Sequence, residues 1–141
     1  MDQSRIGSDQ MTSLPMLLVG HLLGDYVFQP RRMAEMKGQP GGFLLSLLHG
    51  AIYTVCVCLA IWNPSPIAAI MIFLTHWPID RFNVTSWWCR KALDRHPEDA
   101  MLWGHGIRNV RIGFSCLHYA VVDNTFHLLL LMAIWKIGLI G

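Results

Sequence analysis

Three segments of this sequence place a histidine and an aspartate four residues apart within apolar runs. The pairs are His21/Asp25, His76/Asp80 and Asp123/His127. Because an α-helix turns once in about 3.6 residues, each pair presents both side chains on one helix face. Imidazole and carboxylate are common zinc ligands, and they also suit manganese and iron. The pattern therefore predicts a site for one or two divalent metal ions, with zinc favoured.

A fourth apolar run contains His49. A carboxylate buried in a bilayer is unfavourable unless it is paired or bound to a cation, so three such pairs need a common cause. The candidate metal ligands are His21, Asp25, His49, His76, Asp80, Asp123 and His127. The three aspartates are also the candidate catalytic residues, because a carboxylate that does not bind the ion can act as a general base.

Two alternatives to a metal site remain open for these polar groups. One is a hydrogen-bonded packing network, in which aspartates only orient histidines. The other is a proton or ion pathway. A transporter would need a path through both leaflets, and the outer halves of the apolar runs carry no ionisable residue.

The elements that must position these residues are four apolar blocks, near residues 11–28, 43–62, 64–80 and 117–139. The 141 residues are 53% hydrophobic and 14% charged, whereas soluble domains are about 45–50% apolar and about 25% charged. A helix that spans a bilayer needs about 20 apolar residues, which the second and fourth blocks reach. We predict an all-α fold. Residues 1–141 should form a single membrane domain, built as a four-helix integral membrane bundle. The alternative is a soluble or interfacial helical bundle.

The basic residues predict the orientation of this bundle. Nine of the eleven lie in two segments, 29–42 and 81–116, which a four-pass chain places on the same side. The positive-inside rule makes these segments cytoplasmic loops of a cell inner-membrane protein with both termini outside. The reversed order of the last His/Asp pair then puts every aspartate nearer the cytoplasm than its histidine. His49 lies about 9 Å from the inner end of its helix, close to the same depth.

Two short segments of the sequence resemble each other, so the bundle could consist of two similar hairpins. Ser46–Ile52 and Ser115–Val121 are identical at four of seven positions. His118 matches His49 in this comparison, but it should face away from His127, which lies nine positions further along the same helix.

The charge and the cysteines exclude some classes of function, and two arginines allow two interpretations. A net charge of +2 gives no indication of nucleic-acid binding. The four cysteines have no C-x-x-C spacing, so neither a disulfide framework nor a thiolate zinc site is predicted. Arg108 and Arg111 precede the last block, where they could bind an anionic headgroup or phosphate of a substrate or anchor the helix to the cytoplasmic side.

The segments His21–Gln29, Leu47–Gly50, Leu74–Asp80 and Asp123–His127 together resemble domain-of-unknown-function family 3307, a group of small bacterial and phage membrane proteins. The resemblance covers most of the chain from His21 onward. The family's last helix carries Asp-Gln-x-x-His, and Asn124 stands in the Gln position, where the resemblance implies a contact to substrate or to a ligand. Similar His/Asp helices occur in membrane-bound metal-dependent hydrolases and in the zinc phospholipase C and nuclease fold. By analogy, these proteins imply hydrolase activity.

The leading hypothesis is a membrane-embedded metal-dependent hydrolase that acts near the cytoplasmic leaflet on a lipid, lipid-linked or phosphoester substrate. The alternative is a non-enzymatic membrane protein whose His/Asp metal site is structural and which acts by binding a membrane partner. Membrane lipid is the expected partner in the first case. A homodimer is also expected to be favourable, because two of the four helices are short.

Overall fold

The computed structural model describes residues 14–62, 65–95 and 108–139, without the side chains of residues 108–115. This part of the chain is helical and contains no strand, so the all-α prediction is confirmed. The first helix is Leu14–Val27, and its last turn is the π-helical η1 (Leu23–Val27). The further elements are α2 (Arg31–Met36), the 3₁₀ turn η2 (Pro40–Gly42), α3 (Phe43–Ile61), α4 (Pro66–Arg81), α5 (Val84–Ala92) and α6 (Arg108–Lys136).

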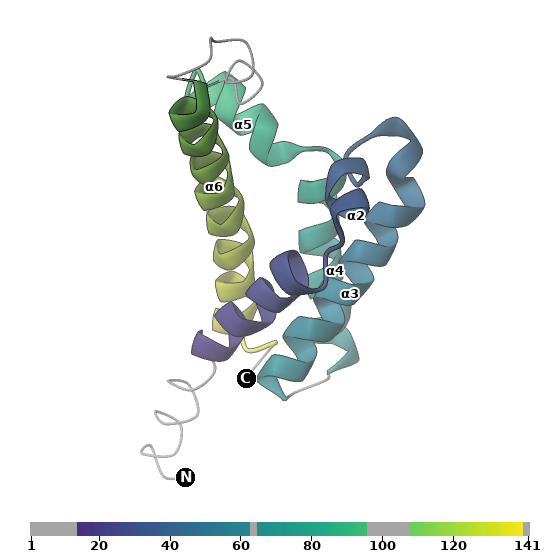
Figure 1. Ribbon diagram of the computed structural model, residues 1–141. Helices are drawn as coiled ribbons and strands as arrows, with labels where there is room; N and C mark the ends of the chain where they lie inside the picture. Colours follow the sequence, from purple (N-terminus) through teal and green to yellow (C-terminus); the bar gives the residue numbers. More distant parts are fainter. Residues whose placement is uncertain (1–13, 63–64, 96–107, 140–141) are drawn as a thin grey trace.

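The helices enclose the middle of the molecule from several sides (Figure 1). Helices α3 and α4 form an antiparallel pair, and α6 stands opposite them. The first helix crosses at the lower end, where η1 packs on α3, and α5 joins α4 to α6 at the upper end. Each long helix therefore has one face turned toward a shared interior.

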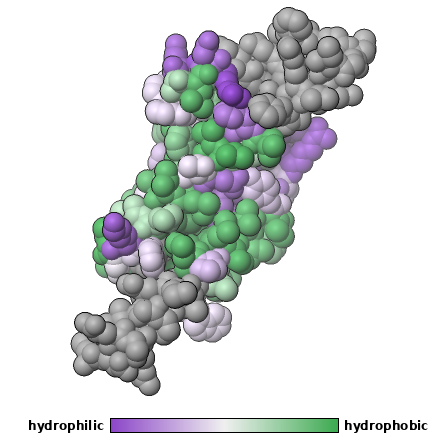
Figure 2. Space-filling view, turned by 90° about the vertical axis from the view of Figure 1, so that its left-hand side faces the viewer, coloured by the Kyte–Doolittle hydropathy of each residue, from purple (hydrophilic) through white to green (hydrophobic). Residues whose placement is uncertain are grey.

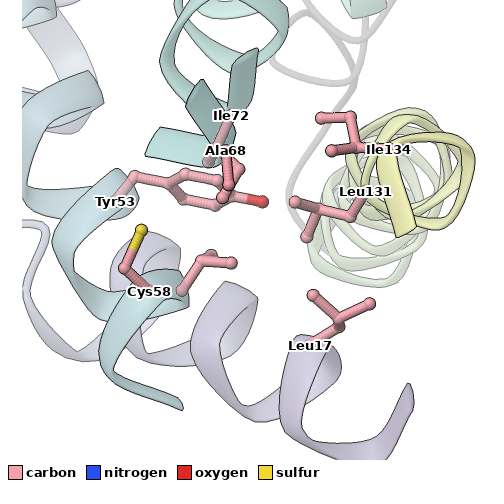
Figure 3. Close-up of a cluster of buried hydrophobic side chains, with 8 residues drawn as sticks. Leu17, Tyr53, Cys58, Ala68, Ile72, Leu131 and Ile134 are labelled. Carbon is pink, nitrogen blue, oxygen red and sulfur yellow. The ribbon is translucent and has the colours of Figure 1, made fainter. Parts of the chain in front are cut away.

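An apolar cluster ties the lower ends of these helices together (Figure 3). Leu17 of the first helix and Leu131 and Ile134 of α6 meet Tyr53 of α3 and Ile72 of α4. All five side chains are almost fully buried. The start of the first helix and the end of α6 thus lie at the same end of the molecule.

Local sequence explains where the α3–α4 hairpin turns. Helix α3 ends at Trp62, whose φ of +53° places it in the left-handed conformation that terminates helices. Helix α4 then begins with Pro66 at its first position, and the Ser65 hydroxyl accepts a hydrogen bond from the Ala68 N–H at 3.5 Å. Both features are favourable helix-start signals.

The predicted loops contain more helix than the apolar blocks indicate. Segment 29–42 includes α2 and η2, and segment 81–116 includes α5 and the first turns of α6. The last helix therefore begins at Arg108, nine residues before the predicted block at 117. The physical reason is that an apolar run marks only the uncharged part of a helix. Arginine and lysine also have high helix propensity, so a helix can continue into a charged segment.

Within the described residues, two helical segments, Pro40–Ile61 and Cys116–Lys136, are long and apolar enough to cross a membrane. The described part of the first helix and the 16-residue α4 are shorter. At 1.5 Å per residue α4 is about 24 Å long, below the roughly 30 Å of a bilayer core. Figure 2 shows hydrophobic residues over the middle of one face and hydrophilic residues gathered toward its upper end.

Candidate metal centre

The i, i+4 spacing places His76 and Asp80 together on the inner face of α4, and His49 of α3 and His127 of α6 face the same interior. His49, His76 and His127 are at most 2% exposed, and Asp80 is 5% exposed. Asp25 comes from the π-helical turn, whose Phe28 N–H donates to the Leu23 carbonyl at 2.9 Å. Such π-turns recur at functional sites because they re-aim a side chain within an otherwise regular helix.

Four ligand atoms from three helices converge on one point: Asp25 Oδ1, His49 Nε2, His76 Nε2 and Asp80 Oδ2. His49 Nε2 lies 3.1 Å from His76 Nε2, 2.9 Å from Asp80 Oδ2 and 3.2 Å from Asp25 Oδ1. His76 Nε2 lies 3.1 Å from Asp80 Oδ2 and 3.8 Å from Asp25 Oδ1. The edges of a tetrahedron around zinc, with bonds near 2.0–2.1 Å, are about 3.3 Å. These buried groups could therefore hold a metal ion.

A second group of ligand atoms comes from Asp25, Asp123 and His127. His127 Nδ1 lies 2.8 Å from the main-chain carbonyl of Asp123 and, as an N–H, donates to it, which directs Nε2 into the interior. The Asp123 carboxylate accepts a hydrogen bond from the Thr85 hydroxyl at 2.6 Å, so α5 helps to orient it. Helix α6 thus brings its pair to the same centre as α3 and α4.

Several buried polar atoms at this centre have no hydrogen-bond partner within the described residues. They include Asp25 Oδ1 and His127 Nε2, both ligand atoms of the centre. Buried polar atoms are almost always hydrogen-bonded, because an unsatisfied one costs about 1–3 kcal/mol. A cation is the partner that a carboxylate oxygen and a bare imidazole nitrogen can share.

His21 is placed differently from the other predicted ligands. Its Nε2 lies 2.5 Å from Asn124 Oδ1, and its Nδ1 lies 3.0 Å from the Tyr53 hydroxyl and 3.3 Å from Asp25 Oδ2. It belongs to neither group of ligand atoms. The ring therefore lies beside Asp25, and its hydrogen bonds go to Asn124 and Tyr53.

Two residues of the centre were not among the sequence-based candidates. Lys37 Nζ lies 2.8 Å from Asp80 Oδ2, and the lysine side chain is only 15% exposed. The Gln29 amide lies 3.1 Å from His49 Nε2 and, with its amide oriented to satisfy both ends, accepts from Lys37 Nζ at 3.0 Å. The position of Gln29, one turn after Asp25, was a signal for its role, whereas nothing in the local sequence marks Lys37.

The end of α4 holds Lys37 in place. Arg81 Nη1 donates to the Gln39 carbonyl at 2.7 Å and to the Lys37 carbonyl at 3.3 Å. Asn83 Nδ2 donates to the Gly38 carbonyl at 3.2 Å. These bonds pin the turn after α2 against α4, so the lysine side chain enters the interior beside Asp80.

Two glycines let the first helix approach α3 closely. A Cβ at Gly20 would lie 2.7 Å from Val57 Cα, and one at Gly24 would lie 2.7 Å from Tyr53 Cδ2. Glycines four residues apart on one helix face are a recognised helix-packing motif in membranes. This spacing was a sequence signal for the packing that carries His21 and Asp25 to the centre.

The remaining candidates lie outside the ligand groups. Asn124 accepts from His21 and donates through Nδ2 to the Tyr26 hydroxyl at 2.5 Å. His118 belongs to neither ligand group. Arg108 and Arg111 are in the first turns of α6, and their side chains lie outside the described residues.

The cysteines take no part in the centre. All four cysteines are free, and three are buried. Burial raises the pKa of the Cys89 thiol on α5, which keeps it in the unreactive protonated form.

A family model described as "Protein of unknown function (DUF3307)" matches residues 14–140. The chain belongs to the DUF3307 family. No curated protein and no solved structure matches this DUF3307 member. The matched range includes every described residue of the candidate metal centre, but the family assignment adds no activity.

Proposed function

We propose that this DUF3307 member is a membrane-embedded, metal-dependent hydrolase that acts near the cytoplasmic leaflet on a lipid or lipid-linked phosphoester. The observation that carries the proposal is the convergence of four ligand atoms, with separations from 2.9 to 3.8 Å, around the edge length of about 3.3 Å of a zinc tetrahedron. Zinc is the favoured ion, and manganese or iron would suit the same donors. Asp25, His49, His76 and Asp80 would hold it.

The distribution of apolar side chains supports a membrane setting with four spanning helices. The first helix, α3, α4 and α6 all expose large apolar residues, among them Leu18, Leu48, Ile70 and Leu129. The interior instead contains buried histidines and Asp80. Water-soluble proteins rarely expose such extensive apolar surface, whereas in a bilayer this surface faces lipid and ionisable groups face the bundle interior.

An apolar groove of about 380 Å³ supports a lipid substrate. It lies between the end of the first helix and α3, and it is lined by Phe28, Ala51, Ile52, Val55, Cys56 and Leu59. Its volume is within the range of small-molecule sites, about 300–1,000 Å³. Phe28 is followed directly by Gln29, whose amide contacts His49. An acyl chain in the groove would thus place a headgroup beside the metal centre.

A bound ion would supply Lewis acidity toward a phosphoryl or acyl oxygen and would lower the pKa of water. The protein's own groups would do the rest. Carboxylates that bind the ion would fix its position, and a carboxylate oxygen that does not bind it could accept a proton from water as a general base. Lys37 lies close enough to Asp80 to attract an anionic group to the centre.

The orientation with cytoplasmic basic segments also belongs to this proposal. Helix α5 carries the exposed Trp87 and Trp88 next to Arg90 and Lys91. Tryptophan and basic residues favour the membrane–water interface on the cytoplasmic side. Helix α5 would then lie in the headgroup plane and border the centre through the contact of Thr85 with Asp123.

Metal content is the first test. Elemental analysis of detergent-purified protein should find at least one equivalent of zinc, manganese or iron, lost in His76→Ala and kept in the matched control His118→Ala. The metal-loaded protein should then cleave a member of a panel of phospholipids, lipid-linked phosphates and nucleotides. Well-folded wild-type protein without metal would overturn the metal centre.

A protein that holds metal but cleaves nothing in the panel would favour the structural alternative. In that case Asp25→Ala and Asp123→Ala should abolish folding, measured by circular dichroism and thermal melting. An enzyme should keep its fold after the loss of at least one carboxylate, because the helices pack through the apolar cluster as well.

A further inference from the structure

The two groups of ligand atoms at the centre share one residue. Asp25 belongs to the group with His49, His76 and Asp80, and also to the group with Asp123 and His127. In each group the ligand atoms lie within 4.8 Å of one another. One carboxylate common to two adjacent sets of ligands is the arrangement of a bridged pair of ions.

The second group does not consist merely of additional ligands for the first ion. His127 Nε2 lies 3.8 Å from Asp80 Oδ1, whereas Asp80 Oδ2 faces His49 and His76. The two oxygens of Asp80 therefore face different histidines. Within the described residues, the buried His127 Nε2 has no hydrogen-bond partner, although its Nδ1 is engaged by the Asp123 carbonyl.

Asp123 has one oxygen available for the same position. Its Oδ1 accepts from Thr85 at 2.6 Å, and its Oδ2 lies 4.0 Å from His127 Nδ1. The Asp123 side chain is 16% exposed, compared with 8% for Asp25 and 3% for Asp80. The second position therefore lies nearer the surface than the first and is the side from which a substrate could approach.

We propose that the centre holds two divalent cations bridged by Asp25 and receives the phosphoryl group of its substrate between them. The first ion is held by His49, His76 and Asp80, and the second by Asp123 and His127. This inference rests on the proposed function and names its metal count and substrate class. His21 Nδ1 lies next to this bridging carboxylate, 3.3 Å from Asp25 Oδ2.

Charge accounts for the preference for a phosphoryl group. The centre contains three carboxylates and the Lys37 ammonium. Two divalent cations together with Lys37 exceed the carboxylates by two positive charges. An excess of buried charge is unfavourable unless an anion balances it, and a phosphate group brings a matching charge with oxygens that can contact both ions. Paired ions about 3.5–4 Å apart are a common arrangement in phosphatases.

The test is to load the purified full-length protein with Mn²⁺ and to measure stoichiometry and electron paramagnetic resonance. The wild type should bind two ions per chain and give the multiline spectrum of an exchange-coupled pair. Asp123→Asn and His127→Ala should each bind one ion and give an uncoupled spectrum. His118→Ala, on the same helix but outside the ligand groups, should match the wild type.

One ion per chain in the saturated wild type would overturn the proposal without the need for any variant. Two ions retained in His127→Ala would also overturn it. The experiments test the pair of ions and the hydrolase activity independently. A coupled pair in a protein that hydrolyses nothing would refute only the hydrolase, and hydrolysis by protein with a single ion would refute only the pair.

Discussion

The Nε2 atoms of His49 and His76 lie 3.1 Å apart, and both lie within 3.1 Å of the same carboxylate oxygen, Asp80 Oδ2. A neutral imidazole has one N–H and one lone pair. If both nitrogens donate their single proton to Asp80 Oδ2, none is left for Asp25 Oδ1, which lies 3.2 Å from His49 Nε2. A cation at this point satisfies all four atoms together.

Removal of metal should lower the thermal stability of the protein. A ligand present at 100 times its Kd stabilises the folded state by about 2.7 kcal/mol. Differential scanning fluorimetry in detergent should therefore show a lower Tm after chelation and recovery on addition of zinc. The His76→Ala variant should show no response to either treatment. An equal Tm with and without metal in the wild type would argue against tight binding.

Gly24→Ala should destabilise the protein and weaken metal binding, as measured by thermal melting and metal titration. The new Cβ would lie 2.7 Å from Tyr53 Cδ2 and 3.0 Å from its Cα, so the first helix must move and carry Asp25 with it. Overpacking of this kind costs about 1–3 kcal/mol. Gly41→Ala is the matched control, because its Cβ would only reach Met36 Cε at 4.0 Å. Unchanged stability and metal affinity in Gly24→Ala would contradict the close packing.

Lys37→Met should strengthen metal binding and weaken binding of inorganic phosphate. The ammonium lies 2.8 Å from Asp80 Oδ2, where it repels a cation and attracts an anion. The loss of one nearby charge changes such equilibria by about tenfold or more. Isothermal titration with Mn²⁺ and then with phosphate measures both effects, and Lys91→Met on α5 serves as the control. If the affinities for Mn²⁺ and for phosphate both rose or both fell, Lys37 would have a structural role instead.

Asn124→Gln should retain more stability and metal affinity than Asn124→Ala. The Asn124 carbonyl oxygen accepts from His21 Nε2, and its amide nitrogen donates to Tyr26. Alanine would leave the buried His21 nitrogen without this acceptor, at a cost of about 1–3 kcal/mol. Glutamine keeps the hydrogen-bond acceptor and the hydrogen-bond donor of the amide, on a longer side chain. Thermal melting and metal titration of the two variants test this ranking, and equal losses would contradict it.

The proposed orientation predicts that a reporter fused after the last helix lies outside the cytoplasm. Alkaline phosphatase fused at the carboxyl end should be active, because it folds only in an oxidising compartment. A second fusion placed directly after α5, within the basic segment 81–116, should be inactive. The opposite pattern would invert the topology and place the centre near the other leaflet.

The sequence by itself determined the features that depend on helix periodicity. Four residues make slightly more than one turn of 3.6 residues, so the two members of each His/Asp pair share a helix face. The reversed order in Asp123/His127 compensates for the opposite direction of its helix relative to α4. The same periodicity indicated that His118 would face away from His127, and His118 lies outside both ligand groups.

Only the tertiary structure decided which atoms meet. The approach of Lys37 to Asp80 joins positions 43 residues apart and depends on the bonds that Arg81 and Asn83 make to the preceding turn. The separation of His21 from the ligand groups depends on Asn124, 103 residues away. Such contacts follow from how helices pack against one another, and no local pattern encodes them, because the same helix faces could have met in another register.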